Sequence, residues 1–175
     1  MAASIDWSIF CKASRSPGGY IMSTHSEEHA TLVIERSLKV KPAAVYAAWS
    51  NAQQKRAWFA CHDDWASEGY SLDFRVGGAE MSKVRGTDGT LHVYQARIND
   101  IVPNRRIVYS YDMLLGDRRI SVSLATVAFA SAAGGTRMVF TEQVVFLDGF
   151  QDGGGRRHGT EEQFVRLELL LHPAG

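Results

Sequence analysis

The amino-acid sequence predicts a single α+β domain in which a curved antiparallel sheet of six or seven strands packs against a long C-terminal helix. Seven segments carry strand-like patterns. Short links rich in Gly, Asn and Asp join the last six of them, which makes neighbouring strands antiparallel. A segment with apolar residues at helical spacing closes the chain, so strands and helices do not alternate as in a parallel α/β fold. A length of 175 residues suits one domain.

The N-terminal segment carries no sustained hydrophobic period. Residues 1–28 are interrupted by a Ser-Pro-Gly-Gly run, so we expect them to form an irregular extension. Residues 29–175 are then the domain. Met22 is a candidate start of the natural chain, because a short polar lead from that residue reaches the first strand.

One strand and two short helices are expected to open the domain. Residues 30–38 alternate and hold β-branched side chains at their centre, which predicts a strand. Residues 41–58 predict the helices, since a proline suits the first turn and Val45 and Trp49 share one face. Asn51 is expected to cap the second helix.

Six further strands and the last helix complete the prediction. Apolar and polar side chains alternate in residues 70–76, 81–85, 91–101, 106–113, 120–130 and 136–146. The helix is expected to begin with a capping box of Thr160 and Gln163, followed by an apolar stripe that includes Phe164 and Leu167. We expect the glycine-rich segment 147–159 to be a flexible gate beside the sheet.

Composition excludes several classes of function. Basic and acidic residues both number 19, so no net field attracts a polyanion and we expect no nucleic-acid binding. No apolar run reaches the roughly 20 residues of a spanning helix, so we expect no membrane insertion. Two cysteines form no disulfide framework and no export signal is evident, which predicts a cytoplasmic protein. A homodimer is compatible with the sequence.

Several segments resemble a known family when taken together. They are PAAVYAAW at 42–49, WF at 58–59, DFRVGG at 73–78, INDIVPNRRIV at 98–108, and GGTRMVFTEQ at 134–143 with FLDG and RHG after it. The pattern is similar to the START-like (SRPBCC) superfamily, and most to its branch related to the C-terminal domain of the heat shock protein 90 ATPase activator. This resemblance implies a helix-grip fold, as in the birch pollen allergen. It also implies a cavity between sheet and last helix, which superfamily members use for lipids, polyketides and other apolar molecules.

The candidate lining of such a cavity consists of large side chains that the strand and helix periods place on the inner faces. These are Trp49, Trp58, Phe74, Tyr94, Ile98, Ile107, Tyr109, Tyr111, Met138, Phe140, Glu142, Phe164 and Leu167. A filled core produces the same alternation, so the sequence leaves both interpretations open.

Glu142 is the most informative single residue of this set. It is in phase with Met138 and Phe140, and a carboxyl group among apolar side chains needs a partner, a proton or contact with water. It is a candidate ligand anchor or general base, with Tyr109 or His92 as the candidate acid. The alternative is a structural ion pair with a nearby Arg or with His92.

Three functions are therefore compatible with the sequence. The first is non-catalytic binding of a small apolar molecule of lipid, polyketide or aromatic type. The second is a cyclase or hydrolase that uses the same cavity, and the third is regulation of a chaperone ATPase or another protein interaction. The eukaryotic activator has a separate N-terminal chaperone-binding domain for which this chain has no room, so we place the third function behind the others.

Three further patterns carry weaker signals, and we expect neither a metal site nor a cofactor. Residues 25–29 match the H-x-x-E-H zinc pattern, but they precede a strand instead of lying on a helix. Residues 61–64 (CHDD) are expected to be a polar loop. Residues 154–159 have part of a phosphate-loop spacing without its lysine.

Overall fold

The computed structural model describes residues 25–59, 65–150, 152 and 154–172. Its elements are β1 (Glu27–Leu38), α1 (Pro42–Ser50), α2 (Ala52–Phe59), β2 (Ala66–Leu72), β3 (Ala79–Arg85), β4 (Leu91–Val102), β5 (Arg106–Leu115), β6 (Arg118–Ala132), β7 (Gly135–Leu147) and α3 (Gly155–Leu171). The expected start at Met22 and the expected loop at 61–64 lie outside the described residues.

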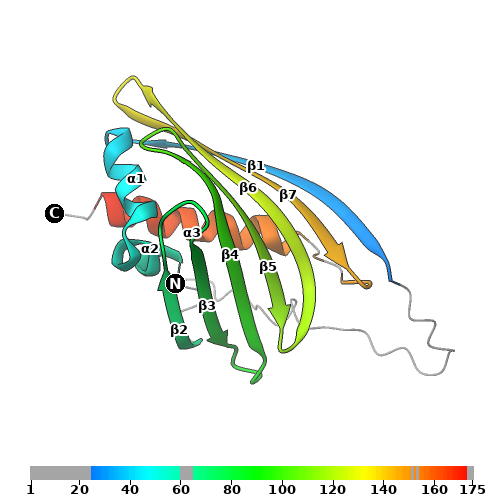
Figure 1. Cartoon of the computed structure of the whole chain (residues 1–175). Helices are drawn as coiled ribbons and strands as arrows, with labels where there is room; N and C mark the ends of the chain where they lie inside the picture. The colour runs from blue at the N-terminus through cyan, green and yellow to red at the C-terminus, as the bar shows by residue number, and fades with distance from the viewer. Residues whose placement is uncertain (1–24, 60–64, 151, 153, 173–175) are drawn as a thin grey trace, which may run out of the picture.

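The strands form one antiparallel sheet in the order β1-β7-β6-β5-β4-β3-β2. Strands β2 to β7 follow one another as a meander, and β1 pairs with β7 from Glu27 opposite Leu147 to Leu38 opposite Thr136. The sheet curves around α3, and α1 and α2 lie at one end of it (Figure 1). The predicted α+β architecture of a curved sheet around a C-terminal helix is confirmed.

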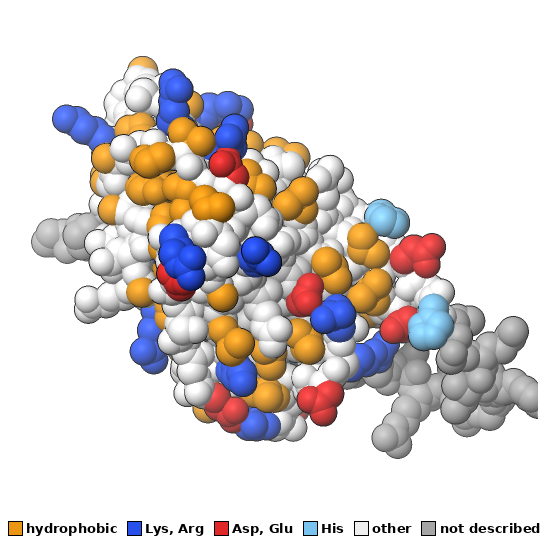
Figure 2. Space-filling model, in the orientation of Figure 1, with side chains coloured by type: hydrophobic (Ala, Val, Ile, Leu, Met, Phe, Trp, Pro, Cys, Tyr) orange, Lys and Arg blue, Asp and Glu red, His pale blue; other side chains and the backbone are white. Residues whose placement is uncertain are grey.

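The core lies between the concave face of the sheet and the helices. In β7, alternate side chains such as Met138, Phe140 and Val144 are buried. Phe164 and Leu167 of α3 are buried opposite them, and the rings of Phe140 and Phe164 are 5.4 Å apart between centroids. Burial of one such side chain contributes about 1.5 to 3 kcal/mol to stability. The surface in Figure 2 mixes hydrophobic side chains with basic and acidic ones.

The strand predicted at residues 70–76 is misplaced by four residues. β2 spans Ala66–Leu72, and the chain then turns, with the Gly78 N–H donating to the Arg75 carbonyl at 2.8 Å. A Cβ atom at Gly78 would lie 2.1 Å from the Asp73 carbonyl oxygen, so this close backbone approach requires glycine. The alternation of Phe74 and Val76 suggested a strand, but it belongs to this turn.

The C-terminal helix begins five residues earlier than predicted. It starts at Gly155, so the expected capping box is wrong: the Thr160 hydroxyl donates to the Arg156 carbonyl inside the helix at 2.9 Å. The carboxylate of Asp152 instead accepts the Arg156 N–H at 2.9 and 3.0 Å. Residues 155–159 are therefore helical and not part of a loop, because an acidic side chain satisfies the free N–H there despite the glycines.

Candidate functional site

An apolar pocket of about 170 Å³ lies between β3, β4, β5 and the first half of α3. Its lining residues are Phe59, Trp65, Ser82, Val84, His92, Tyr94, Tyr111, Met113, Gly155, Arg156, Gly159, Thr160, Glu162, Gln163 and Arg166. Aromatic and aliphatic side chains come from the sheet, α2 and Trp65, whereas polar side chains come mainly from α3. Such a mixture orients a ligand through its polar end while its apolar part is buried.

A smaller inner pocket of about 30 Å³ adjoins the apolar pocket. It is lined by Trp49, Lys55, Trp58, Phe59, Tyr94, Tyr109, Tyr111, Phe140, Thr160, Gln163 and Phe164. A space of this size holds one water molecule or one small polar group.

The candidate residues predicted from the sequence are divided among three places. Tyr94, Tyr111 and His92 line the apolar pocket. Trp49, Trp58, Tyr109, Phe140 and Phe164 line the inner pocket, as do Tyr94 and Tyr111. The other members of the set line neither pocket; they are Phe74, Ile98, Ile107, Met138, Glu142 and Leu167. Much of the inner face around these two pockets is thus packed core.

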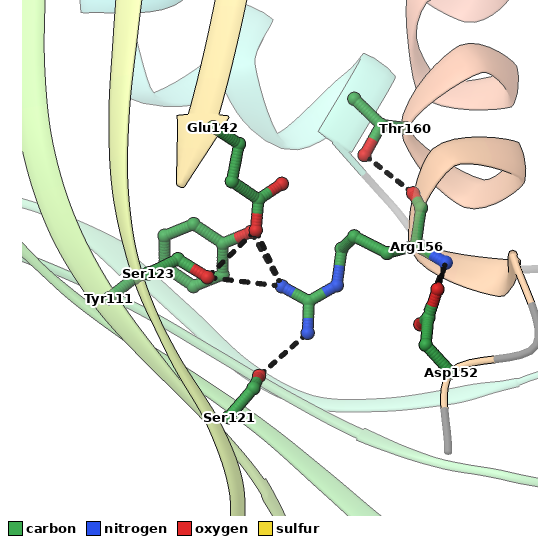
Figure 3. Close-up of polar contacts among 7 residues, drawn as sticks. All are labelled: Tyr111, Ser121, Ser123, Glu142, Asp152, Arg156 and Thr160. Atoms are coloured by element: carbon green, nitrogen blue, oxygen red, sulfur yellow. Dashed lines mark hydrogen bonds and ion pairs between the residues drawn. The ribbon is translucent and has the colours of Figure 1, made fainter. Parts of the chain in front are cut away.

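Glu142 is fully buried, and its partner is Arg156 of α3 (Figure 3). Arg156 Nη1 lies 3.0 Å from Glu142 Oε1, which also accepts hydrogen bonds from the Tyr111 hydroxyl at 2.5 Å and the Ser123 hydroxyl at 2.7 Å. Arg156 Nη2 donates to the Ser121 hydroxyl at 2.7 Å. We call Tyr111, Ser121, Ser123, Glu142 and Arg156 the Glu142 network. It joins β5, β6 and β7 to α3 through charge-assisted hydrogen bonds.

Electrostatics fix the protonation of Tyr111 and Arg156 in this network. Burial raises the pKa of Tyr111 well above that of an exposed tyrosine, although Arg156 opposes the shift. Burial alone would lower the pKa of Arg156, but Tyr111 and Glu142 raise it above its usual range. Tyr111 therefore stays a hydroxyl donor and Arg156 stays a cation.

The structural alternative predicted for Glu142 fits this geometry, with Arg156 as the partner and not His92. Arg156 was missing from the predicted site because its segment carries four glycines within seven residues, 153–159, which favoured a loop. Asp152, an acidic residue just before the helix, was the available signal for a helix start there. The catalytic roles considered for Glu142, Tyr109 and His92 stay predictions.

A second buried ionic group was absent from the predicted site. Lys55 of α2 and Glu80 of β3 are 2% and 6% exposed. Glu80 accepts hydrogen bonds from the Tyr70 and Tyr94 hydroxyls at 2.8 and 3.4 Å. Lys55 follows two glutamines in a polar stretch, so its sequence surroundings gave no sign that the side chain points inward.

The residues that the structure describes form neither a metal cluster nor a membrane-spanning helix. No group of three or more His, Cys, Asp or Glu side chains that could hold a metal ion occurs in the part of the chain that the structure describes. His25 lies 3.3 Å from Asp148, and His29 is in β1, so the H-x-x-E-H pattern does not lie on a helix. Among the described helices, none has the length and apolar character needed to cross a membrane.

Known proteins provide an independent comparison. Residues 39–172 match the family model described as "Activator of Hsp90 ATPase homolog 1-like protein". An uncharacterized protein from Rhizobium leguminosarum is 58% identical, with a TM-score of 0.83 over 86% of this chain and 99% of its own. The Mll3558 protein from Rhizobium loti is 37% identical, with a TM-score of 0.77 over 83% and 99%.

More distant structures share the fold alone. Protein NE0264 from Nitrosomonas europaea is 18% identical, with a TM-score of 0.63 over 81% of this chain and 93% of its own. No curated protein matches the chain. The helix-grip fold expected from the sequence is confirmed, and the chain belongs to the family of Activator of Hsp90 ATPase homolog 1-like proteins.

Proposed function

We propose that this protein binds a small, largely apolar molecule of about the size of one aromatic ring in the apolar pocket. The observation that carries the proposal is a space of about 170 Å³ bounded by Phe59, Val84, Tyr94 and Met113. An apolar cavity of about 150 Å³ holds benzene in another protein, whereas drug-sized ligands need about 300 to 1,000 Å³. Volume thus favours the aromatic type of ligand over a long lipid or a polyketide.

The experiment is isothermal titration calorimetry of the full chain with benzyl alcohol and with indole. At the roughly 0.3 kcal/mol per heavy atom that larger ligands gain, molecules this small bind weakly, so titrations should extend to millimolar concentrations. We expect saturable binding in the wild type and a loss of at least tenfold in Val84→Phe, which fills the pocket.

Met81→Phe is the matched control for this experiment. It adds the same ring to β3, but Met81 is 36% exposed and does not line the pocket. Affinity should stay within twofold of the wild type. Absence of binding to the wild type, or equal losses in the two variants, would contradict the proposal.

A second candidate function, contact with a chaperone, is favoured by one surface. Val165, Leu169 and Leu170 of α3 are 50%, 65% and 38% exposed, and apolar side chains grouped on one exposed helix suit a protein partner. The family description supplies the candidate, an Hsp90-type ATPase. Leu169→Arg should abolish any effect of this protein on the ATPase rate of a purified Hsp90-type chaperone. An ATPase rate that does not respond to the wild type would remove this candidate.

A further inference from the structure

Lys55 holds a positive charge inside an aromatic cage next to the inner pocket. Its Nζ atom lies 3.9 Å from the ring centroid of Trp49, 4.1 Å from that of Trp58 and 4.4 Å from that of Phe59. Cation–π contacts of this kind stabilise a buried ammonium group. They do not neutralise it, so a nearby anion would still gain from the charge.

Within the described residues, the ion pairs shorter than 4.0 Å do not include Lys55. Burial lowers the pKa of Lys55 to about 8, and the charge of Glu80 opposes this shift. The carboxylate oxygens of Glu80 already accept hydrogen bonds from Tyr70 and Tyr94. At neutral pH Lys55 is therefore mainly a desolvated cation without a carboxylate in direct contact.

Trp49 provides a second, independent indication that the inner pocket receives a hydrogen-bond acceptor. Its indole Nε1 is buried without a hydrogen-bond partner among the described residues, and leaving a buried donor unbonded is unfavourable. Trp49 and Lys55 both line the inner pocket, and so does Tyr109. Burial raises the pKa of Tyr109 well above 10, so its hydroxyl remains a donor. Three groups able to donate hydrogen bonds thus border a space of about 30 Å³.

The inner pocket and the apolar pocket share part of their lining. The residues that border both are Phe59, Tyr94, Tyr111, Thr160 and Gln163. We propose that the ligand is an aromatic carboxylate, whose ring occupies the apolar pocket and whose carboxylate is held in the inner pocket by Lys55 and Trp49. This inference rests on the proposed binding function and adds the chemical class of the ligand.

The test compares benzoate with benzyl alcohol, which has a similar ring without the charge. In calorimetric titrations of the full chain at pH 7, benzoate should bind at least tenfold more tightly than benzyl alcohol. Lys55→Met keeps a long unbranched side chain in the cage and should reduce this preference to twofold or less. Lys83→Met is the matched control on β3, since Lys83 lines neither pocket, and it should keep the preference.

A second measurement needs no variant. In a ¹H–¹⁵N spectrum, the indole N–H signal of Trp49 should move downfield with benzoate and much less with benzyl alcohol. Acetate, which lacks the ring, should bind at least tenfold more weakly than benzoate.

Each outcome separates the two proposals. Benzyl alcohol and benzoate binding with equal affinity would overturn the carboxylate inference and leave the proposed function intact. Acetate as tight as benzoate would overturn the aromatic part of the inference. Absence of binding by benzoate, benzyl alcohol and indole alike would overturn the proposed function itself.

Discussion

Glu142 and Lys55 are both buried ionisable side chains behind the concave sheet, but their surroundings are opposite. Glu142 has a cation, Arg156, and two hydroxyl groups on one of its oxygens. Lys55 has three aromatic rings and no carboxylate within 4.0 Å among the described residues. A charge that the protein itself compensates stabilises its own fold, whereas a charge that it leaves exposed to a pocket is available to a ligand. This difference is why we place the proposed ligand anchor at Lys55 and not at Glu142.

The largest effect is expected from removing the cation of the Glu142 network. Arg156→Met leaves Glu142 buried without its partner, and breaking a buried pair in this way costs about 3 to 5 kcal/mol. Chemical denaturation followed by circular dichroism measures the free energy of unfolding. The double variant with Glu142→Gln should recover part of the loss, since no charge is then left unpaired. A single variant as stable as the wild type would show that the network is not structural.

A smaller and pH-dependent effect is expected at Lys55. Burial lowers the pKa of Lys55 in the folded protein to about 8, below the 10.5 of an exposed lysine, so the unfolded chain binds more protons between these pH values and stability rises with pH. The penalty of the buried charge should fall by about 2 kcal/mol between pH 7 and pH 9.5. Denaturation of the wild type and Lys55→Met at both pH values measures it.

In that experiment, the difference in the free energy of unfolding between Lys55→Met and the wild type should become smaller as the pH rises. Staying below pH 10 keeps the unfolded tyrosines protonated. Lys83→Met serves as the control, because it also removes one lysine charge but at a position that lines neither pocket. Parallel pH profiles for the wild type and Lys55→Met would mean that burial does not shift the titration of Lys55.

The smallest effect is expected for Glu142→Gln on ligand binding. Glu142 lines neither pocket, so the affinities for benzoate and benzyl alcohol should stay within twofold of the wild type. Calorimetry under the conditions used for Lys55→Met measures them. A tenfold loss of affinity would contradict this expectation and would support Glu142 as a ligand contact or general base.

The strand pattern was predictable because one face of each strand is buried. Met138 and Phe140 alternate with exposed or half-buried residues in β7, and the period of two follows from the backbone itself. The start of α3 was predicted wrongly, since Thr160 and Gln163 satisfy a local pattern for helix capping, while Asp152, whose carboxylate accepts the Arg156 N–H, lies before a run of glycines. Local patterns compete, and packing against the sheet decides between them.

The candidate site was predictable only in part. Tyr94, Tyr109, Tyr111 and Trp49 were expected near a cavity because they are large and in phase with the core. Lys55 was not, because a lysine in a polar helical segment is normally solvated.

The sequence by itself determined the order of elements, the antiparallel meander, the helix-grip fold and the need of Glu142 for a partner. Only the tertiary structure decided which arginine pairs with Glu142, how much of the inner face is filled, and that Lys55 points into an aromatic cage. The physical reason is the separation along the chain over which each kind of interaction acts. Periodicity and turn chemistry act between neighbours in the chain, whereas ion pairs such as Arg156–Glu142 and Arg137–Glu35 join side chains 14 and 102 residues apart, which meet only after the sheet has formed.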